Sequence, residues 1–244
     1  MRVAIHQPNF FPWMGYFNKM AKSDLFILLD TVQLSDSGTG QRNRILNKNG
    51  EVSFLTVAFD KKNYFHKNIS DVKLNLNIDW QKRQYNFLWD TYHRFPTWDE
   101  VYQAISPIYE NNYSFLYEVN KEAIDIVCEM LQISTKIVKA SELDYDRSLH
   151  KSDLVLELCK SVNADIYLSG NGARKYMNVH DFHKNEIQVQ YQIFQHPFYQ
   201  QKYAKDNVVL GLSILDVLFN CGIEETKRLF WNNLQEKEKN EPDI

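Results

Sequence analysis

Cysteine is scarce in this sequence, and long apolar runs are missing from it. The three cysteines, Cys128, Cys159 and Cys221, are odd in number and far apart, which argues against a disulfide framework and a thiolate zinc site. Their apolar surroundings predict buried thiols instead. No segment approaches the length of a membrane span, and the start MRVAIHQPNFF turns polar too early for a signal peptide. We therefore expect a cytoplasmic protein.

An excess of one charge is also lacking. The 28 basic and 31 acidic residues are well mixed and leave a net charge of -3, so no field over the whole protein would hold nucleic acid. Local basic sites are still compatible with this composition. With 44% hydrophobic residues, the 244-residue chain can bury a substantial core. The 14% of aromatic residues fit either an aromatic core or a surface that stacks on rings or sugars.

Common catalytic and metal-binding signatures are absent as well. The sequence contains neither HExxH nor GxSxG, and no cysteine has a recognisable partner histidine. His180 and His183 have a spacing that metals use on helices, but no third ligand accompanies them, which favours a solvated or hydrogen-bonded pair. The sequence signals neither a metal nor a dinucleotide cofactor.

The order of apolar segments predicts an α/β fold with a parallel sheet. RVAIH (2–6), a helix over 13–22 and LFILL (25–29) form a βαβ unit, because strand, turn, helix and strand follow within about thirty residues. Further strands are expected at 51–59, 135–140, 164–170 and 187–192, and further helices at 152–162 and from Ser213 and Glu224 onwards. Three successive helices at 79–93, 98–111 and 114–131 have no strand between them and predict a helical insertion or lateral layer over 79–131. The polar residues 235–244 should be frayed.

Unusual polar residues cluster at the ends of three predicted strands. These stretches are His6–Asn9, Asp30–Gln33 and Ser169–Gly172. In an open parallel sheet, ligands collect beyond the carboxyl ends of the strands. Capping of loops and helix ends would explain each stretch alone. Three of them at one sheet edge favour a single binding cleft.

The stretch IHQPNFFPWMGYF (5–17) combines two prolines with several aromatic residues. Pro8 and Pro12 restrict the backbone on both sides of Asn9-Phe10-Phe11, so this turn should be stiff. We expect Phe10, Phe11 and Phe17 to pack inward. Trp13 and Tyr16, three residues apart, should share a helix face and could line the cleft. Gly15 would let a ligand or the sheet approach the backbone closely.

Two further stretches could bind an anion. GQRNRI (40–45) follows SDSGTG (35–40), whose composition suggests a mobile loop. Arg42 and Arg44 would lie on the same side of an extended segment and could grip a phosphate or carboxylate, unless they are simply solvated. SGNGARKYM (169–177) could open a short helix whose free amides accept an anion, with Tyr176 in the site or in the core. Ser213 and Asp216 look like a helix cap and a first-turn acid.

These pieces together resemble the WbqC-like protein family. The matching stretches are HQPNFFPWMGYF, FILLDTVQ, QRNRI, YLSGNGARKYM and SILDVLFNCG, and they span most of the chain, so residues 1–244 are expected to form a single WbqC-like domain. Members occur in bacterial O-antigen and other surface-polysaccharide gene clusters. The resemblance implies transfer of glycine, or a related small acyl group, onto a sugar. This implication comes from genetic setting and not from chemistry.

The first strand and helix are also distantly similar to nucleotidyltransferases of the HUP type, which carry HxGH at this point. Here the equivalent residues are Trp13-Met14-Gly15-Tyr16, so the glycine is retained and both histidine positions hold aromatic residues. Losing such stabilisation of a phosphoryl transition state costs on the order of a hundredfold in rate. The similarity therefore implies a HUP-like sheet and a nucleotide-shaped pocket, while adenylyl transfer by the usual route is disfavoured.

The hypothesis from sequence is an acyl or aminoacyl (glycine) transferase. Its acceptor would be an amino sugar linked to a nucleotide or a lipid, and its donor an aminoacyl thioester on a carrier protein, an aminoacyl-tRNA or an ATP-activated amino acid. The alternatives are a sugar-nucleotide-binding protein without catalysis and a divergent nucleotidyltransferase. His6 is the candidate general base, because its ordinary pKa suits proton transfer near neutrality, and Asp30 would orient the acceptor beside it. The candidate substrate-binding residues are Gln7, Asn9, Trp13, Tyr16, Gln33, Arg42, Asn43, Arg44, Ser169, Gly170, Asn171, Gly172 and Tyr176.

Overall fold

A five-stranded parallel sheet forms the base of the molecule in the computed structural model, which describes residues 1–34, 38–205, 207–234 and 239–240. The strands are β1 (Arg2–His6), β2 (Leu25–Leu28), β5 (Lys136–Lys139), β6 (Ile166–Ser169) and β7 (Gln188–Tyr191), in the order β5-β2-β1-β6-β7. A two-residue strand, β8 (Lys239–Asn240), pairs antiparallel with β7. The order of the parallel strands reverses between β1 and β6, as in doubly wound Rossmann-like folds. The predicted α/β class with a parallel sheet is confirmed.

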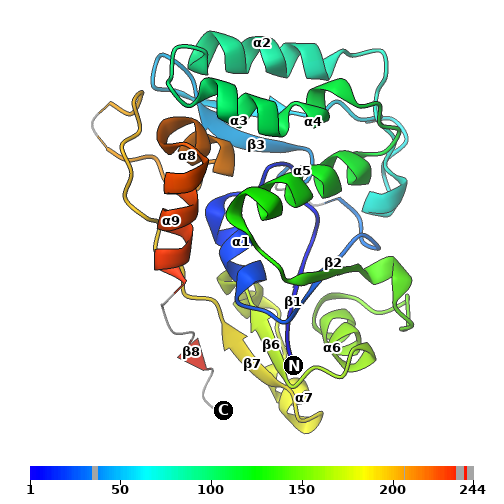
Figure 1. Cartoon of the computed structure of the whole chain (residues 1–244). Helices are drawn as coiled ribbons and strands as arrows, with labels where there is room; N and C mark the ends of the chain where they lie inside the picture. Colours follow the sequence, from blue (N-terminus) through cyan, green and yellow to red (C-terminus); the bar gives the residue numbers. More distant parts are fainter. Residues whose placement is uncertain (35–37, 206, 235–238, 241–244) are drawn as a thin grey trace.

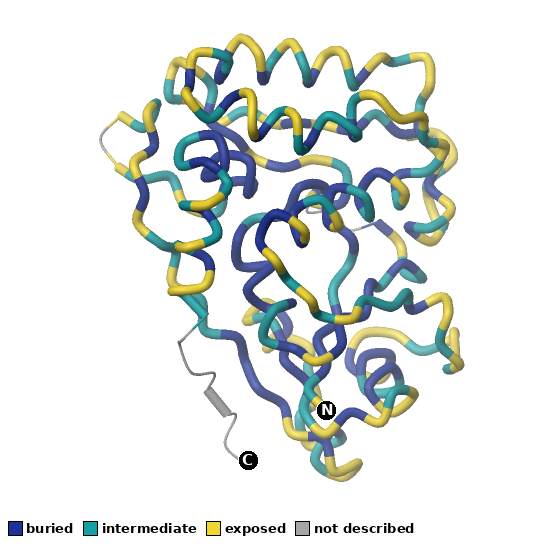
Figure 2. Tube along the Cα trace, viewed as in Figure 1, coloured by how far each residue is buried: buried dark blue, intermediate teal, exposed yellow. Residues whose placement is uncertain are grey.

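Each face of this sheet belongs to a different core. On β1, Ala4 packs into a large cluster with helix α1 (Met14–Ala21) and helix α5 (Leu116–Leu131), whereas Val3 and Ile5 pack into a second cluster with helix α6 (Lys151–Ser161) and helix α7 (Val179–Lys184). Alternate residues of a strand point to opposite faces, and both faces are covered, which explains why LFILL and the middle of RVAIH are apolar. In Figure 2 these strands are mostly dark blue.

The helices predicted between residues 79 and 131 are present. They are α2 (Trp80–Tyr92), α3 (Trp98–Ile105), α4 (Pro107–Glu110) and α5. The helix expected over 98–111 is interrupted, because Pro107 begins a separate short helix and cannot continue the preceding hydrogen-bond ladder. Figure 1 shows α2, α3 and α4 gathered at one end of the molecule, remote from α6 and α7. Two helices, α8 (Ile214–Cys221) and α9 (Ile223–Asn233), end the described helical part of the chain.

The segment QRNRI is extended in the structure. It forms β3 (Arg42–Leu46), which pairs antiparallel with β4 (Val52–Thr56) in a separate hairpin. Asn43 and Ile45 are buried and Arg42 and Arg44 exposed, so the period-two pattern of a half-buried strand was present in the sequence. The predicted mobility of SDSGTG falls partly on residues 35–37, which lie outside the described residues, as do 235–238 and 241–244 of the predicted frayed tail.

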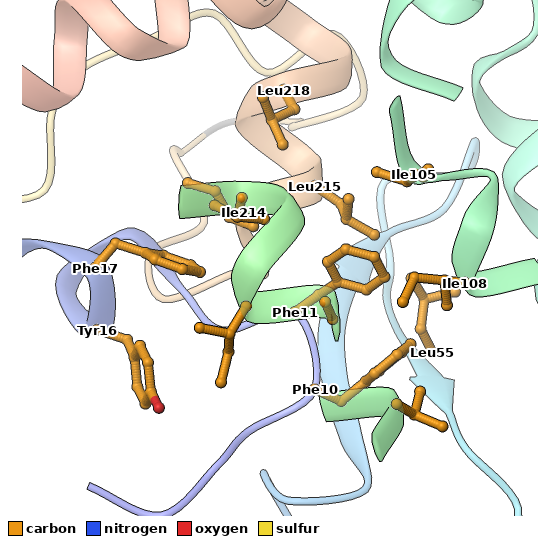
Figure 3. Close-up of a cluster of buried hydrophobic side chains, with 14 of the residues drawn as sticks. Phe10, Phe11, Tyr16, Phe17, Leu55, Ile105, Ile108, Ile214, Leu215 and Leu218 are labelled. Carbon is orange, nitrogen blue, oxygen red and sulfur yellow. The ribbon is translucent and has the colours of Figure 1, made fainter. Parts of the chain in front are cut away.

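The aromatic turn after β1 is buried in the larger core. Phe10, Phe11 and Phe17 are fully buried, as predicted, and Figure 3 shows them among side chains from the hairpin and from α8. The backbone of Phe11 has a φ of 36°, in the region that favours glycine. Its carbonyl accepts hydrogen bonds from Asn43 Nδ2 at 2.8 Å and from Ser213 Oγ at 2.8 Å. The surrounding elements thus hold this turn in place and satisfy its backbone.

Ser213 and Asp216 have different roles in α8. Ser213 Oγ accepts a hydrogen bond from the Leu215 amide, which confirms the predicted cap. Asp216, in contrast, is completely buried and accepts hydrogen bonds from the Tyr92 hydroxyl at 3.2 Å and the Tyr199 hydroxyl at 2.8 Å. Burial raises the pKa of this carboxyl to about 6, although the two tyrosine hydroxyls oppose the shift. Asp216 therefore joins α2 and α8 and is more than a first-turn acid.

The cysteines are only partly as expected. Cys128 and Cys159 are buried, whereas Cys221 is part-exposed because it lies in the last turn of α8. None of the helices in the described ranges is long and apolar enough to cross a membrane.

Candidate functional site

The carboxyl ends of β1, β2 and β6 lie at one edge of the parallel sheet. Ala4 of β1 pairs with Leu168 of β6, so His6 and Gly170 each follow the last paired residue of their strand by two positions. On the other side His6 pairs with Leu28, two residues before Asp30. The three polar strand ends therefore lie at one sheet edge, and the strand order reverses between β1 and β6, which is where ligands bind in open α/β sheets.

His6 is held as a neutral imidazole at the end of β1. Its Nδ1 lies 3.0 Å from the Gln7 carbonyl oxygen, so Nδ1 carries the proton and donates, and Nε2 keeps its lone pair. The ring meets Tyr16 edge-to-face, with centroids 4.8 Å apart. Burial, and then the charge of Lys19, lower the pKa of His6 to about 3. His6 is thus a proton acceptor at neutral pH, but a weak one.

Lys19, which the sequence analysis did not single out, lies beneath this edge. Its side chain is only 3% exposed, and its Nζ donates to the Ile5 carbonyl at 3.0 Å. Burial lowers the pKa of this amine to about 7. The one signal in the sequence was a lysine inside the otherwise apolar run of α1.

Lys19 should make the stability of the protein depend on pH. Above about pH 7 the amine is neutral in the fold, whereas the unfolded chain keeps its proton up to about pH 10.5. The folded state then binds fewer protons, so the free energy of unfolding rises with pH in this window. Relative to Lys19→Met, the wild type should gain about 1 kcal/mol per pH unit between pH 7.5 and 9. Urea unfolding of both proteins at several pH values measures the two free energies of unfolding. If they changed with pH in the same way between pH 7.5 and 9, Lys19 would not be a buried amine that titrates in this range.

Asp30 is 1% exposed and is fixed against the 3₁₀ turn η2 (Ala140–Glu142) that follows β5. Its Oδ1 accepts from the Ser141 amide at 2.9 Å and its Oδ2 from the Ser141 hydroxyl at 2.6 Å. Both oxygens thus have partners from the neighbouring strand end, and sequence reasoning missed Ser141. These bonds give Asp30 a structural task, and its catalytic role stays a prediction.

The loop after β6 leaves backbone accessible at the same edge. A Cβ atom added to Gly170 or Gly172 would meet nothing within 4 Å. Asn171 Nδ2 donates to the Gln192 carbonyl at 3.1 Å and ties the loop to the end of β7. The expected short helix is a 3₁₀ helix, η3 (Asn171–Lys175). Ser169 is completely buried, and Tyr176, at 48% exposure, is not a core residue.

The aromatic residues at the start of α1 fill space within the protein. Tyr16 is 2% exposed, and its hydroxyl donates to the Gln7 carbonyl at 3.3 Å. The indole of Trp13 occupies the space in front of Gly15, where a Cβ would lie 2.4 Å from it, and packs edge-to-face on Phe194. The two residues therefore face different neighbours. The positions equivalent to the HxGH histidines hold packing residues.

The remaining polar residues near β1 lie on both sides of the turn. Gln7 is part-exposed, and its Nε2 donates to the carbonyl of exposed Gln33 at 3.4 Å, while Asn9 is buried. Among the described residues, no group of three or more His, Cys, Asp or Glu side chains could hold a metal ion.

Asn43, Arg44 and Arg42 of the hairpin make three different kinds of contact. Asn43 is buried and donates to the carbonyls of Phe10 and Phe11. Arg44 Nη1 contacts the Leu210 carbonyl at 3.5 Å. Arg42 stacks on the ring of Phe54 and lines a cavity of about 1030 Å³ whose lining includes none of the residues at the sheet edge. Arg42 and Arg44 thus share the exposed face of β3, as predicted, but contact different neighbours.

This fold and its polar edge define a doubly wound α/β protein of Rossmann-like type. Residues 7–228 match the model of the WbqC-like protein family, and the chain belongs to that family, which confirms the resemblance. The chain is similar to "Uncharacterized protein Rv1507c" of Mycobacterium tuberculosis (strain ATCC 25618 / H37Rv), with 32% identity over 225 residues, 91% of this chain and 95% of the relative. No solved structure matches it significantly.

Proposed function

We propose that the protein is a transferase that adds glycine, or another small acyl or aminoacyl group, to an amino sugar during surface-polysaccharide (O-antigen) biosynthesis. The observation that carries the proposal is that a neutral His6 ends β1, while Gly170 to Gly172, whose Cβ positions are open space, follow the neighbouring strand β6. A proton acceptor near backbone amides that can receive an oxyanion is the combination that acyl transfer requires.

In this mechanism the amine of the sugar attacks the carbonyl carbon of the acyl donor. The nitrogen becomes positively charged and strongly acidic in the tetrahedral intermediate, so even a weak base such as His6 Nε2 can take its proton. Amides near Gly170 to Gly172 stabilise the oxyanion. When the intermediate collapses, the new C–N bond is kept and the bond between the acyl carbon and the leaving group breaks. His6 then gives its proton to the leaving group.

The acceptor is an amino sugar linked to a nucleotide or a lipid. The donor is an aminoacyl thioester on a carrier protein, an aminoacyl-tRNA or an amino acid activated by ATP. Gln7, Asn9 and Asp30 would orient the acceptor. The cytoplasmic location predicted from the sequence is part of this proposal, since sugar nucleotides and activated amino acids are made there.

The low basicity of His6 favours one alternative, a sugar-nucleotide-binding protein without catalysis. A third class, a divergent nucleotidyltransferase, is disfavoured by the packing of Trp13 and Tyr16 at the HxGH positions.

Incubation of the purified protein with amino-sugar nucleotides and small acyl donors, followed by mass spectrometry, separates the three. A gain in sugar mass equal to a glycyl or acyl group is the expected result. Release of pyrophosphate would indicate nucleotidyl transfer, and saturable binding without product would indicate the binding protein.

A further inference from the structure

A cavity lies between the hairpin and α2, on a different part of the molecule from the sheet edge. Its volume is about 1030 Å³. From α2 it is lined by Trp80, Arg83, Gln84 and Phe87, whose spacing places them on one helix face. The opposite wall includes Arg42 and Phe54, both on the exposed face of the hairpin. In Figure 1, α2 lies at the top above β3.

The lining is strongly basic in a protein of net charge -3. It contains four cationic side chains, Arg42, Lys61, Lys62 and Arg83, against a single carboxylate, Asp60. None of the four forms an ion pair with another residue that the structure describes. Arg42 instead lies 4.5 Å from the centre of the Phe54 ring. Unpaired guanidinium groups beside aromatic rings suit a phosphorylated ligand that carries a planar ring.

Two side-chain amides in the cavity wall each have one buried atom without a hydrogen-bond partner among the described residues. Gln84 is 4% exposed, and its Oε1 accepts from the Tyr109 hydroxyl at 3.3 Å, whereas its Nε2 has no acceptor. Gln41 Oε1 is likewise buried without a donor. A buried polar group without a partner destabilises the protein. Both atoms are closed to solvent, so a ligand in the cavity would contact them only once these side chains turn toward it, and a heterocyclic base offers both an acceptor and a donor.

We infer that this cavity binds the nucleoside diphosphate portion of a sugar nucleotide. The base stacks against the aromatic side chains and pairs with the two glutamines, while Arg42 and Arg83 bind the diphosphate. The volume suits a ligand of this size. The biological meaning of the inference rests on the proposed function, because a nucleotide-linked amino sugar is one of its acceptors.

The cavity wall and the sheet edge are linked through the turn after β1. Asn120 Nδ2 donates to the Pro8 carbonyl at 3.0 Å and to the Gly40 carbonyl at 2.7 Å, so these two carbonyls are adjacent. Gln41, which lines the cavity, follows Gly40, and His6 lies two residues before Pro8. Chain geometry then limits the separation of the Gln41 and His6 Cα atoms to about 20 Å.

Isothermal titration calorimetry with UDP, TDP, ADP, GDP and inorganic pyrophosphate tests the inference on the whole chain. At least one nucleoside diphosphate should bind about tenfold tighter than pyrophosphate, which corresponds to about 1.4 kcal/mol. The double variant Arg42→Gln/Arg83→Gln should weaken that binding by about tenfold or more, because charge-assisted bonds to phosphate are lost. Arg94→Gln, which changes an exposed arginine outside the cavity, is the matched control and should bind like the wild type.

The variant Gln84→Met distinguishes binding of the nucleotide base from binding of the diphosphate. It should weaken binding of the nucleoside diphosphate several-fold and leave pyrophosphate binding unchanged. The inference is overturned if no nucleoside diphosphate binds, if pyrophosphate binds equally well, or if the double variant and Arg94→Gln behave alike. Binding without any acyl transfer would contradict only the proposed function, and transfer without this binding only the present inference.

Discussion

Replacing Phe11 with alanine should destabilise the protein by about 3–5 kcal/mol, because a fully buried ring is lost from a core that can collapse only partly. Domains are commonly stable by only about 5–15 kcal/mol, so this one change would remove a large share of the total. Figure 3 shows the ring surrounded by side chains of α8 and the hairpin. Urea unfolding measures the loss.

Two further variants identify the cause. Phe198→Ala, at a phenylalanine that is 80% exposed, should change stability by less than about 0.5 kcal/mol. Phe11→Gly should be no worse than Phe11→Ala, because glycine tolerates the φ of 36° better than alanine does. A loss below about 1 kcal/mol for Phe11→Ala would mean that the aromatic turn is not part of the core and is free to contact a ligand.

Replacing His6 with alanine should lower kcat for acyl transfer by about 10²–10⁴-fold, the usual range for removal of a general base. KM for the amino sugar should change far less, since the proposed role is proton transfer. Steady-state kinetics with the donor and acceptor found by mass spectrometry give both constants. Unfolding curves should show that the variant is folded.

The pH profile offers a second readout for the same group. With the pKa of His6 lowered to about 3, the imidazole is already neutral throughout the physiological range. His6 should therefore contribute no step to the pH profile near pH 6.5, where an unperturbed histidine would become protonated, and a fall there reflects protonation of the attacking amine. Unchanged kcat and KM in His6→Ala would end the assignment of His6 as base.

The first βαβ unit could be predicted because its strands are buried on both faces. RVAIH and LFILL are continuous apolar runs, which is what parallel strands covered on both sides require. The hairpin was harder to recognise. In RNRIL two exposed arginines alternate with buried residues, and a half-buried strand so short and so basic resembles a loop.

The grouping of polar strand ends at one sheet edge could be predicted from topology alone. The cavity could not be predicted from the sequence. Strand ends meet wherever parallel strands neighbour one another, so His6 and Gly170 could be grouped from the sequence. Arg42 and Arg83 are far apart in the chain and come together only when α2 packs over the hairpin. The hydrogen-bond partners Ser141 and Tyr199 could not be predicted either, because hydrogen bonds between distant segments leave no periodic signal in the sequence.

The most direct test of the account is a crystal structure of the protein with an amino-sugar nucleotide. The account predicts that the phosphates contact Arg42 and Arg83 and that the sugar amine lies within about 3.5 Å of His6 Nε2, the reach needed for proton transfer. A sugar whose amine is directed away from His6, with the edge formed by β1 and β6 left empty, would contradict it.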